Sequence, residues 1–375
     1  MPQLTERQIT LGEILAKRTT DAAPELVDPL ENKAVRCYSC GHRCKVLNGL
    51  SGICKVRYNE DGVLKVPRGY VAALQVDPIE KKPFFHAYPG ALALSFGMLG
   101  CDYHCGYCQN WVTSQAIRDP VAGAPPSDVE PADLVKLAKK NGAQVITSTY
   151  NEPLITSEWA VEVFKEATKA GLICSYVSNG NGTERVLDYI APYVTMYKVD
   201  LKGFSDAHYR ELGGTLQPVL DTIRGLKQRG IWVEIVTLVI PGFNDSEEEL
   251  TKIAEFLASV DGNIPWHITA YHEDYKMHNE ATRPQHLLRA YEIGKRAGLR
   301  YIYPGNIPGA FGDLESTHCP TCNAVVIGRC GFRVTSYKLE DGKCASCGTE
   351  IPGVWGDGSA SIGRDGIPRP VFTLS

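Results

Sequence analysis

The sequence predicts an α/β fold, a partial or full TIM-like (β/α) barrel that carries a small cysteine-rich metal-binding module at each end. Between about residues 91 and 304, β-rich apolar runs alternate with longer segments of helical periodicity, a pattern typical of parallel βα units. Outside that region, cysteines gather near both ends of the chain. We therefore expect an N-terminal region with a four-cysteine module (1–90), the barrel (91–310) and a C-terminal zinc-ribbon or rubredoxin-like module (311–375).

The strands of the barrel are expected where apolar runs stop at turn residues, at 92–98, 143–149, 172–177, 196–201, 231–240, 264–271 and 299–303. The segments between them, such as PADLVKLAKKN and SEEELTKIAEFLASV, carry apolar residues at i, i+3 or i+4 and i+7. This spacing predicts amphipathic helices, and Ser246 with the glutamates after it predicts a helix start.

Charge and composition exclude several classes of protein. The chain has 375 residues, of which 39 are basic and 43 acidic, and its net charge of -4 gives no field that attracts nucleic acid or an anionic membrane. No signal peptide is evident, and no window reaches about 18 uninterrupted apolar residues. We therefore expect a soluble, cytoplasmic protein, in which thirteen cysteines indicate metal sites rather than disulfides.

Three cysteines, Cys101, Cys105 and Cys108, follow the first expected strand in the segment LGCDYHCGYCQNW. A structural zinc site needs four ligands, and no fourth cysteine follows at ribbon spacing. His104 lies inside the motif, where it would only compete for the same corner. Three thiolates instead suit a [4Fe-4S] cluster that keeps one iron open for a ligand from outside the protein. Buried or zinc-binding cysteines are the alternative.

The C-x3-C-x2-C spacing, with Tyr107 before the last cysteine, resembles the signature of the radical S-adenosylmethionine (SAM) superfamily. This resemblance implies that SAM binds the open iron and that Tyr107 lies against its adenine. It also implies reductive cleavage of SAM to a 5′-deoxyadenosyl radical, which abstracts hydrogen from a substrate. The carboxyl ends of the strands of a barrel form a mouth that encloses such a radical.

The ends of two later strands extend the resemblance. In STYNEP, Glu152 takes the position at which the superfamily holds the SAM amino group, although Tyr150 and Asn151 stand where that family usually has glycines. In SNG, Ser178 and Asn179 are candidates to hydrogen-bond a ribose or a carboxylate. A turn at the Asn-Gly pair is the structural alternative.

Three further segments supply the remaining candidates. KVDLKGF places Asp200 and Lys202 on one face of the fourth strand and is similar to the Asp-x-Lys of glycyl-radical activating enzymes, which implies contact with SAM. A structural ion pair is the alternative. By the same resemblance, Val239 and Ile240 of LVIPGFND contact the adenine, and His272 of ITAYHEDYKM contacts SAM, although a lone histidine is often structural.

Taken together, the segments from about residue 92 to 303 resemble pyruvate formate-lyase activating enzyme. The particular segments YNEP, KVDLKGF, YHEDYKM and YPGNIPG resemble the AmmeMemoRadiSam family more closely still. Before the barrel, the connector DPIEKKPFFHAYPG carries Glu80, Lys81, Lys82 and His86. These residues either contact the substrate or, by default, belong to a solvated connector.

Two cysteine modules flank the barrel. At the N-terminus the spacing C-x2-C-x3-C-x9-C predicts four metal ligands for a structural zinc or an auxiliary iron-sulfur cluster, with His42 a less suitable ligand; they are Cys37, Cys40, Cys44 and Cys54. At the C-terminus two C-x2-C pairs predict a structural metal, zinc rather than iron, held by Cys319, Cys322, Cys344 and Cys347. Cys330 is spare, unless an auxiliary cluster uses it.

The leading hypothesis is an enzyme that cleaves SAM reductively and abstracts hydrogen from a protein, peptide or small molecule. Its partners would be that substrate and a one-electron donor of the flavodoxin or ferredoxin type. A narrower version is a glycyl-radical-enzyme activase, although the two extra cysteine modules exceed what such an enzyme needs. A hypothesis of another class is a metal-dependent nucleic-acid or protein binding module with an inert barrel, but the C-x2-C pairs lack the basic and aromatic residues typical of nucleic-acid binding.

Overall fold

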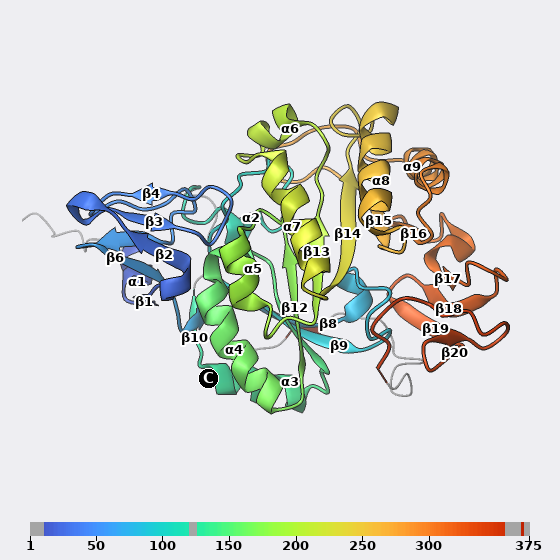
Figure 1. Cartoon of the computed structure of the whole chain (residues 1–375), viewed down its shortest axis with the longest axis horizontal. Coiled ribbons are helices and arrows are strands. Elements are labelled where there is room, and N and C mark those ends of the chain that lie inside the picture. The colour runs from blue at the N-terminus through green and yellow to red at the C-terminus, as the bar shows by residue number, and fades with distance from the viewer. Residues whose placement is uncertain (1–10, 120–125, 357–368, 371–375) are drawn as a thin grey trace, which may run out of the picture.

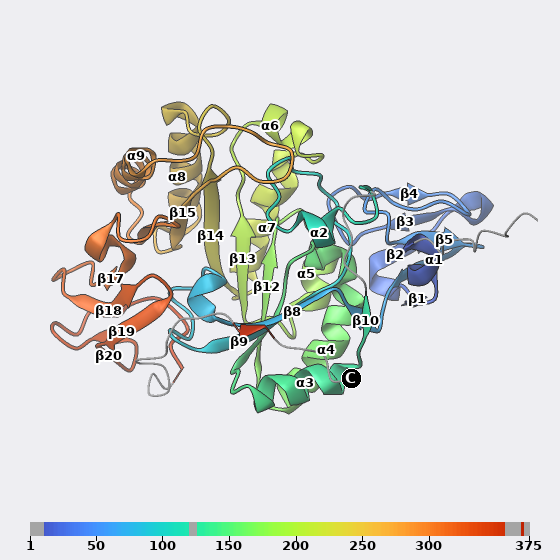
Figure 2. The ribbon, with the colours of Figure 1, turned by 180° about the vertical axis from the view of Figure 1, so that it is seen from behind.

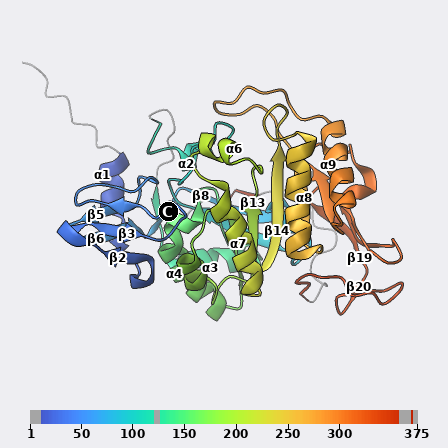
Figure 3. The same ribbon diagram turned by 45° about the horizontal axis from the view of Figure 1, so that its top comes forward.

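The computed structural model describes residues 11–119, 126–356 and 369–370. A β-rich N-terminal region and a small C-terminal β module lie at opposite ends of a central α/β part (Figures 1 and 3). Residues 1–10 and most of residues 357–375, which the expected first and last units include, lie outside the described ranges. The expected boundaries between the three units stay a prediction.

The central part is built on one large sheet with the strand order β16-β15-β14-β13-β12-β11-β9-β8-β22. Its parallel strands are β9 (Leu92–Gly97), β11 (Val145–Ser148), β12 (Ile173–Ser178), β13 (Met196–Asp200), β14 (Trp232–Val239), β15 (Trp266–Ala270) and β16 (Ile302–Gly305). Each coincides with an expected strand to within three residues at either end. Within the described ranges β16 and β22 are the two edges of the sheet, so the barrel is partial.

Two strands that the sequence analysis missed complete this sheet. β8 (Ala73–Pro78) pairs antiparallel with β9, and β22 (Arg369–Pro370) pairs antiparallel with β8. β8 contains the first two residues of the connector, and residues 79–90 follow it directly. The connector therefore lies against the sheet and does not project from it.

The helices that join the parallel strands cover one face of the sheet (Figures 1 and 2). They are α3 (Pro131–Lys140), α4 (Ser157–Lys169), α5 (Glu184–Ile190), α6 (Asp206–Glu211), α7 (Leu216–Gln228), α8 (Glu247–Asp261) and α9 (Pro284–Arg296). The short α2 (Trp111–Ser114), in the connection after β9, lies on the other side (Figure 2). The expected start of α8 is confirmed, because the Ser246 hydroxyl accepts a hydrogen bond from the Glu249 amide at 3.2 Å. Leu250, Ile253 and Leu257 of this helix are fully buried, as the helical spacing predicts.

The N-terminal region consists of short strands and one helix. Its elements are α1 (Leu11–Ala16), β1 (Thr19–Asp21), β2 (Val27–Pro29), β3 (Val35–Cys37), β4 (Lys45–Val46), β5 (Tyr58–Glu60), β6 (Val63–Pro67) and β7 (Tyr70–Val71), with β10 (Ser127–Asp128) paired to β7. A buried ion pair ties this region to α4: Arg57 Nη1 lies 2.7 Å from Glu158 Oε2. The two side chains are only 2% and 5% exposed, so the pair fixes the region on the barrel.

The C-terminal module has a small core of its own. Its strands are β17 (Thr317–His318), β18 (Val325–Cys330), β19 (Arg333–Tyr337), β20 (Leu339–Glu340) and β21 (Lys343–Cys344). Val326, Ile327, Val334 and Leu339 are buried in it. The Arg329 guanidinium donates to the Phe85 carbonyl at 2.6 Å, so the module packs on the connector.

The interpretation of residues 77–90 as a solvated connector is wrong. Glu80, Lys82 and His86 are at most 4% exposed. Lys82 Nζ lies 2.5 Å from Asp77, and His86 Nε2 lies 2.6 Å from the Tyr303 hydroxyl. Buried polar groups are stable only when they are paired. Here Asp77 is a local partner, and Tyr303 comes from a distant part of the chain.

Among the described helices, none combines the length and the apolar character needed to cross a lipid bilayer.

Candidate active site

A cavity of about 470 Å³ opens at the carboxyl ends of the parallel strands. The loop after β9 brings its three cysteines to the wall of this cavity. Tyr107 of the same loop and most of the residues singled out from later strand ends lie there too, the latter being Glu152, Ser178, Asn179, Asp200 and Lys202. The structure therefore gathers side chains that are up to a hundred residues apart in the sequence at one place.

The three cysteines of the β9 loop are held by the local backbone and by neighbouring side chains. Cys101 Sγ accepts a hydrogen bond from the Tyr103 amide at 3.4 Å, and Cys108 Sγ lies 3.2 Å from the Ser114 hydroxyl. Burial raises the pKa of all three thiols, that of Cys105 to about 12. Because a metal binds thiolates, loading of this site must release protons.

These three cysteines fit an open iron-sulfur cluster better than a single ion. They line the cavity without a fourth cysteine among its described lining residues. Their sulfurs also do not converge to within 4.8 Å of one another, as the ligands of one ion would. A four-iron cluster places a separate iron under each thiolate and so needs a wider set of sulfurs.

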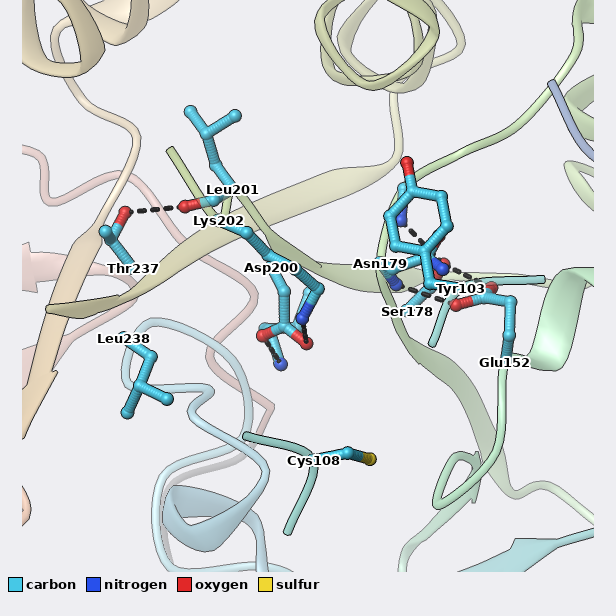
Figure 4. Close-up of polar contacts among 12 residues, drawn as sticks. Tyr103, Cys108, Glu152, Ser178, Asn179, Asp200, Leu201, Lys202, Thr237 and Leu238 are labelled. Carbon is cyan, nitrogen blue, oxygen red and sulfur yellow. Dashed lines mark hydrogen bonds and ion pairs between the residues drawn. The ribbon is translucent and has the colours of Figure 1, made fainter. Parts of the chain in front are cut away.

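Glu152, Ser178 and Asn179 form one hydrogen-bonded group between β11 and β12. The Ser178 hydroxyl donates to Glu152 Oε1 at 2.6 Å, and the Asn179 amide donates to Oε2 at 2.8 Å (Figure 4). Burial, with the nearby charge of Asp102, raises the pKa of Glu152 to about 8. Oε1 also accepts a hydrogen bond from the Leu154 amide at 3.1 Å. Oε2 therefore keeps the lone pair with which the group can accept a hydrogen bond from a ligand in the cavity.

Tyr150, just before Glu152, has the positive φ of 68°, which is uncommon for an aromatic residue. Its hydroxyl lies 3.0 Å from both Lys82 Nζ and Asp77 Oδ2. A Cβ at Gly97 would lie 2.7 Å from the Cβ of Tyr150, so glycine is required where β9 passes this turn. The tyrosine thus links the cavity wall at β11 to the connector.

Asp200 is the centre of a second polar group. It pairs with Lys198 at short range and with Lys202 at 3.4 Å (Figure 4). Burial opposes its ionisation, but the two ammonium charges keep the pKa of Asp200 below its ordinary value. The sequence analysis missed Lys198, although it precedes Asp200 by two residues and therefore shares its face of β13.

The two residues predicted at the end of β14 to contact the adenine lie away from the cavity, and their role stays a prediction. Val239 and Ile240 are fully buried and lie outside the set of residues that line the cavity, whereas Val236 and Leu238 line it. Side chains alternate along the strand, so Val239 points to the opposite face from Leu238, and β14 ends before Ile240. Leu238 is the apolar side chain of this segment at the cavity (Figure 4).

His272, the last predicted contact for SAM, does not line the cavity either. It lies exposed in the loop after β15, where its Nε2 is 3.1 Å from the side-chain nitrogen of Gln109. Gln109 itself lines the cavity. The structure therefore places His272 behind Gln109 at the rim.

Asp102 is a member of the site that the sequence analysis missed. It is completely buried, and its two carboxylate oxygens accept hydrogen bonds from the side-chain amides of Asn179 (2.8 Å) and Asn181 (2.7 Å). The pairing joins the β9 loop to the end of β12. Its place between two of the motif cysteines was visible in the sequence, but its partners were not.

The two terminal cysteine groups differ in geometry. In the C-terminal group, Cys319 Sγ lies 3.5 Å from Cys347 Sγ, and Cys322 Sγ lies 3.7 Å from Cys344 Sγ. A metal-sulfur bond of about 2.3 Å in a tetrahedron requires about 3.8 Å between sulfurs, so this group fits one zinc or iron ion. Cys330 is exposed and is not part of it. The N-terminal cysteines do not converge to this extent.

Comparison with known proteins places the chain among radical SAM proteins. The family model described as "Radical SAM superfamily" matches residues 97–257. The uncharacterized protein MJ0808 of Methanocaldococcus jannaschii is 34% identical over 329 residues, which cover 86% of this chain and 97% of that protein. The pyruvate formate-lyase-activating enzyme of Staphylococcus aureus is 26% identical over 231 residues, 56% of this chain and 88% of the enzyme.

Among solved structures, SuiB of Streptococcus suis bound to S-adenosylmethionine aligns with a TM-score of 0.47 at 15% identity, over 64% of this chain and 56% of SuiB.

Proposed function

Because this chain belongs to the radical SAM superfamily, we propose that Cys101, Cys105 and Cys108 hold a [4Fe-4S] cluster and that the enzyme cleaves SAM to abstract hydrogen from an organic substrate. The observation that carries the proposal is the convergence of three cysteines, without a fourth in the described lining, on the cavity that also holds Glu152, Asp200 and Lys202. The cluster would supply one electron to the sulfonium of SAM, which breaks a carbon-sulfur bond.

The residues of this chain would bind and orient SAM. The Glu152 carboxylate is fixed by hydrogen bonds from Ser178, Leu154 and Asn179, and its Oε2 offers the remaining lone pair to the ammonium group of SAM. Lys202 Nζ lies 5.8 Å from the centre of the Tyr107 ring and would hold the carboxylate or ribose of SAM over that ring. Asp200 keeps this ammonium in place.

The cavity would also protect a radical. Tyr107 and Cys105 are at most 7% exposed, and Phe85 and Tyr303 add further aromatic surface to the cavity lining. A wall of this kind limits access of water to the reacting atoms. The substrate class, a protein, peptide or small molecule, is left open by this proposal, as is the narrower activity of a glycyl-radical-enzyme activase.

The test is anaerobic. The protein is reconstituted with iron and sulfide, reduced and mixed with SAM, and 5′-deoxyadenosine is followed by mass spectrometry. The triple variant Cys101→Ala/Cys105→Ala/Cys108→Ala should yield none, and Cys330→Ala, an exposed cysteine outside both terminal groups, should behave as wild type. If the wild type carries a reducible cluster but does not bind SAM, the proposal fails, and a binding protein with an inert barrel becomes the better interpretation.

A further inference from the structure

The N-terminal cysteines lie together around β3 and β4, between the barrel and the surface. Cys37 ends β3, its amide donates to the Cys44 carbonyl at 2.9 Å, and Cys44 immediately precedes β4. Cys37, Cys40 and Cys54 are at most 7% exposed. Cys44 Sγ accepts a hydrogen bond from the Ile53 amide at 3.5 Å, beside Cys54. Four cysteines thus lie in one module, three of them buried, and the proposed reaction does not use them.

The spacing of these sulfurs distinguishes between the two metals that the sequence left open. In this same structure the C-terminal cysteines approach to 3.5 and 3.7 Å, the spacing of ligands around one tetrahedral ion. The N-terminal sulfurs, all in described residues, contain no set of three within 4.8 Å of one another. In this they match the three cysteines of the β9 loop. A wide set of four thiolates fits a cluster with one iron under each sulfur.

Histidine ligation, which would favour zinc, is not available at this site. His42 Nε2 lies 3.2 Å from the Asp102 carbonyl, and its ring packs edge-on against Tyr103 at 6.3 Å between centroids. Its Nε2 is therefore directed at the β9 loop. The remaining donors are four thiolates, the ligand set of an iron-sulfur cluster.

The N-terminal module is also in direct contact with the catalytic loop. Its Gly41 amide donates to the Asn181 carbonyl at 2.8 Å. A Cβ at Gly100, the residue before Cys101, would lie 2.7 Å from Val56 and 3.2 Å from the Cys54 carbonyl. Only glycine permits this approach, because Gly100 also has a φ of +94°. One cysteine of each group therefore lies next to the contact between the two segments.

We propose that Cys37, Cys40, Cys44 and Cys54 hold a second iron-sulfur cluster that passes electrons to the cluster of the β9 loop. The route follows His42, which lies between Cys40 and Cys44, to the Asp102 carbonyl and on to the adjacent Cys101. A one-electron carrier protein reduces the second cluster and is itself oxidised. The second cluster is then reoxidised as it reduces the first, and no proton is transferred. The relay rests on the proposed function, but the presence of the second cluster does not.

Metal analysis tests the cluster independently of activity. Each protein is reconstituted anaerobically, and iron, acid-labile sulfide and zinc per chain are measured with the electron paramagnetic resonance (EPR) spectrum of the reduced state. The variants are Cys40→Ala/Cys44→Ala, the triple variant of the β9 loop, and Cys319→Ala/Cys322→Ala as the matched control. The triple variant should keep about half of the iron and sulfide, with a spectrum that SAM does not change. The Cys40→Ala/Cys44→Ala variant should keep the other half, with a spectrum that SAM does change.

The control should lose its C-terminal metal and keep the iron and sulfide of both clusters. A triple variant that holds no iron-sulfur cluster after reconstitution would overturn the proposal. This result does not depend on whether Cys40→Ala/Cys44→Ala folds, because the triple variant leaves the N-terminal module intact.

The relay has its own readout. With a reduced flavodoxin as the donor, Cys40→Ala/Cys44→Ala should lose formation of 5′-deoxyadenosine, and a small chemical reductant such as dithionite should restore it. Equal loss with both reductants would show a structural role only and would refute the relay. A wild type that forms no 5′-deoxyadenosine, yet retains two clusters, would refute the proposed function and not the second cluster.

Discussion

The ion pair between Arg57 and Glu158 should control how firmly the N-terminal region is held on the barrel. The guanidinium meets both carboxylate oxygens, at 2.7 and 2.8 Å, and donates to the Ile155 carbonyl at 3.1 Å. Since both side chains are almost completely buried, Glu158→Ala leaves an unpaired guanidinium in the interior, which costs about 3–5 kcal/mol. That cost corresponds to an increase of roughly two to four orders of magnitude in the equilibrium constant for local opening of this region.

Hydrogen exchange of the β5 and β6 amides measures this opening directly. Glu248→Ala is the matched control, because it removes a surface pair with Lys252 at a similar distance of 2.6 Å, and such pairs contribute little. Arg57→Met/Glu158→Met removes both charges and should recover most of the loss. Protection in Glu158→Ala equal to that of the control, or a double variant as labile as the single one, would refute the reasoning.

Three further predictions concern pH, SAM and the electron donor. Burial lowers the pKa of His86 from 6.5 to about 4, so the unfolded chain binds a proton that the folded one does not, and His86 should reduce the free energy of unfolding as pH falls through that window. Urea titrations at several pH values measure how the free energy of unfolding changes with pH. In His86→Gln this slope should be smaller by at most about 1.4 kcal/mol per pH unit, and an unchanged slope would contradict the prediction. Lys202→Met should weaken SAM binding, measured by calorimetry, by about tenfold to a hundredfold through the loss of one charged hydrogen bond, whereas Lys252→Met should not change it. Exposed Leu47, Leu50 and Ile53 lie within residues 43–55, a segment with three basic and no acidic side chains. Lys55→Glu should therefore slow the reduction of this protein by an acidic flavodoxin, whereas Lys338→Glu, in the C-terminal module, should not change that rate.

The positions of the parallel strands and of the cysteine loop could be predicted because their signals are local. An apolar run followed by turn residues marks a strand end, and a strand end in a parallel sheet is where a ligand site forms. The same reasoning predicted that Glu152, Asp200 and Lys202 lie close together, and all three line one cavity. It did not bring Val239 and Ile240 to that cavity, because the face that a residue occupies depends on where the strand ends, and such ends are the least certain part of a sequence-based prediction.

The burial of the connector could not be predicted in this way. Glu80, Lys82 and His86 are polar, and a polar segment before a barrel normally lies in solvent. The Glu80 and Arg329 side chains form an ion pair across 249 positions of sequence, and His86 meets Tyr303 across 217. Only the folded chain shows these partners, since nothing in the spacing of either segment refers to the other.

The N-terminal and C-terminal modules contact different parts of the protein around the cavity. The cysteine spacing of each module predicts a metal site but not these contacts. The N-terminal module contacts the cysteine loop through His42, which meets the Asp102 carbonyl, and through Cys54 and Val56, which pack on Gly100. The C-terminal module contributes Phe332 to the cavity lining and holds Phe85 of the connector through Arg329. A metal at the C-terminal cysteines would therefore stabilise a part of the cavity wall that the cysteine loop does not form. Loss of that metal should change which substrates fit while leaving the binding of SAM intact, and comparison of Cys319→Ala/Cys322→Ala with wild type for SAM affinity would show whether the two sides are independent.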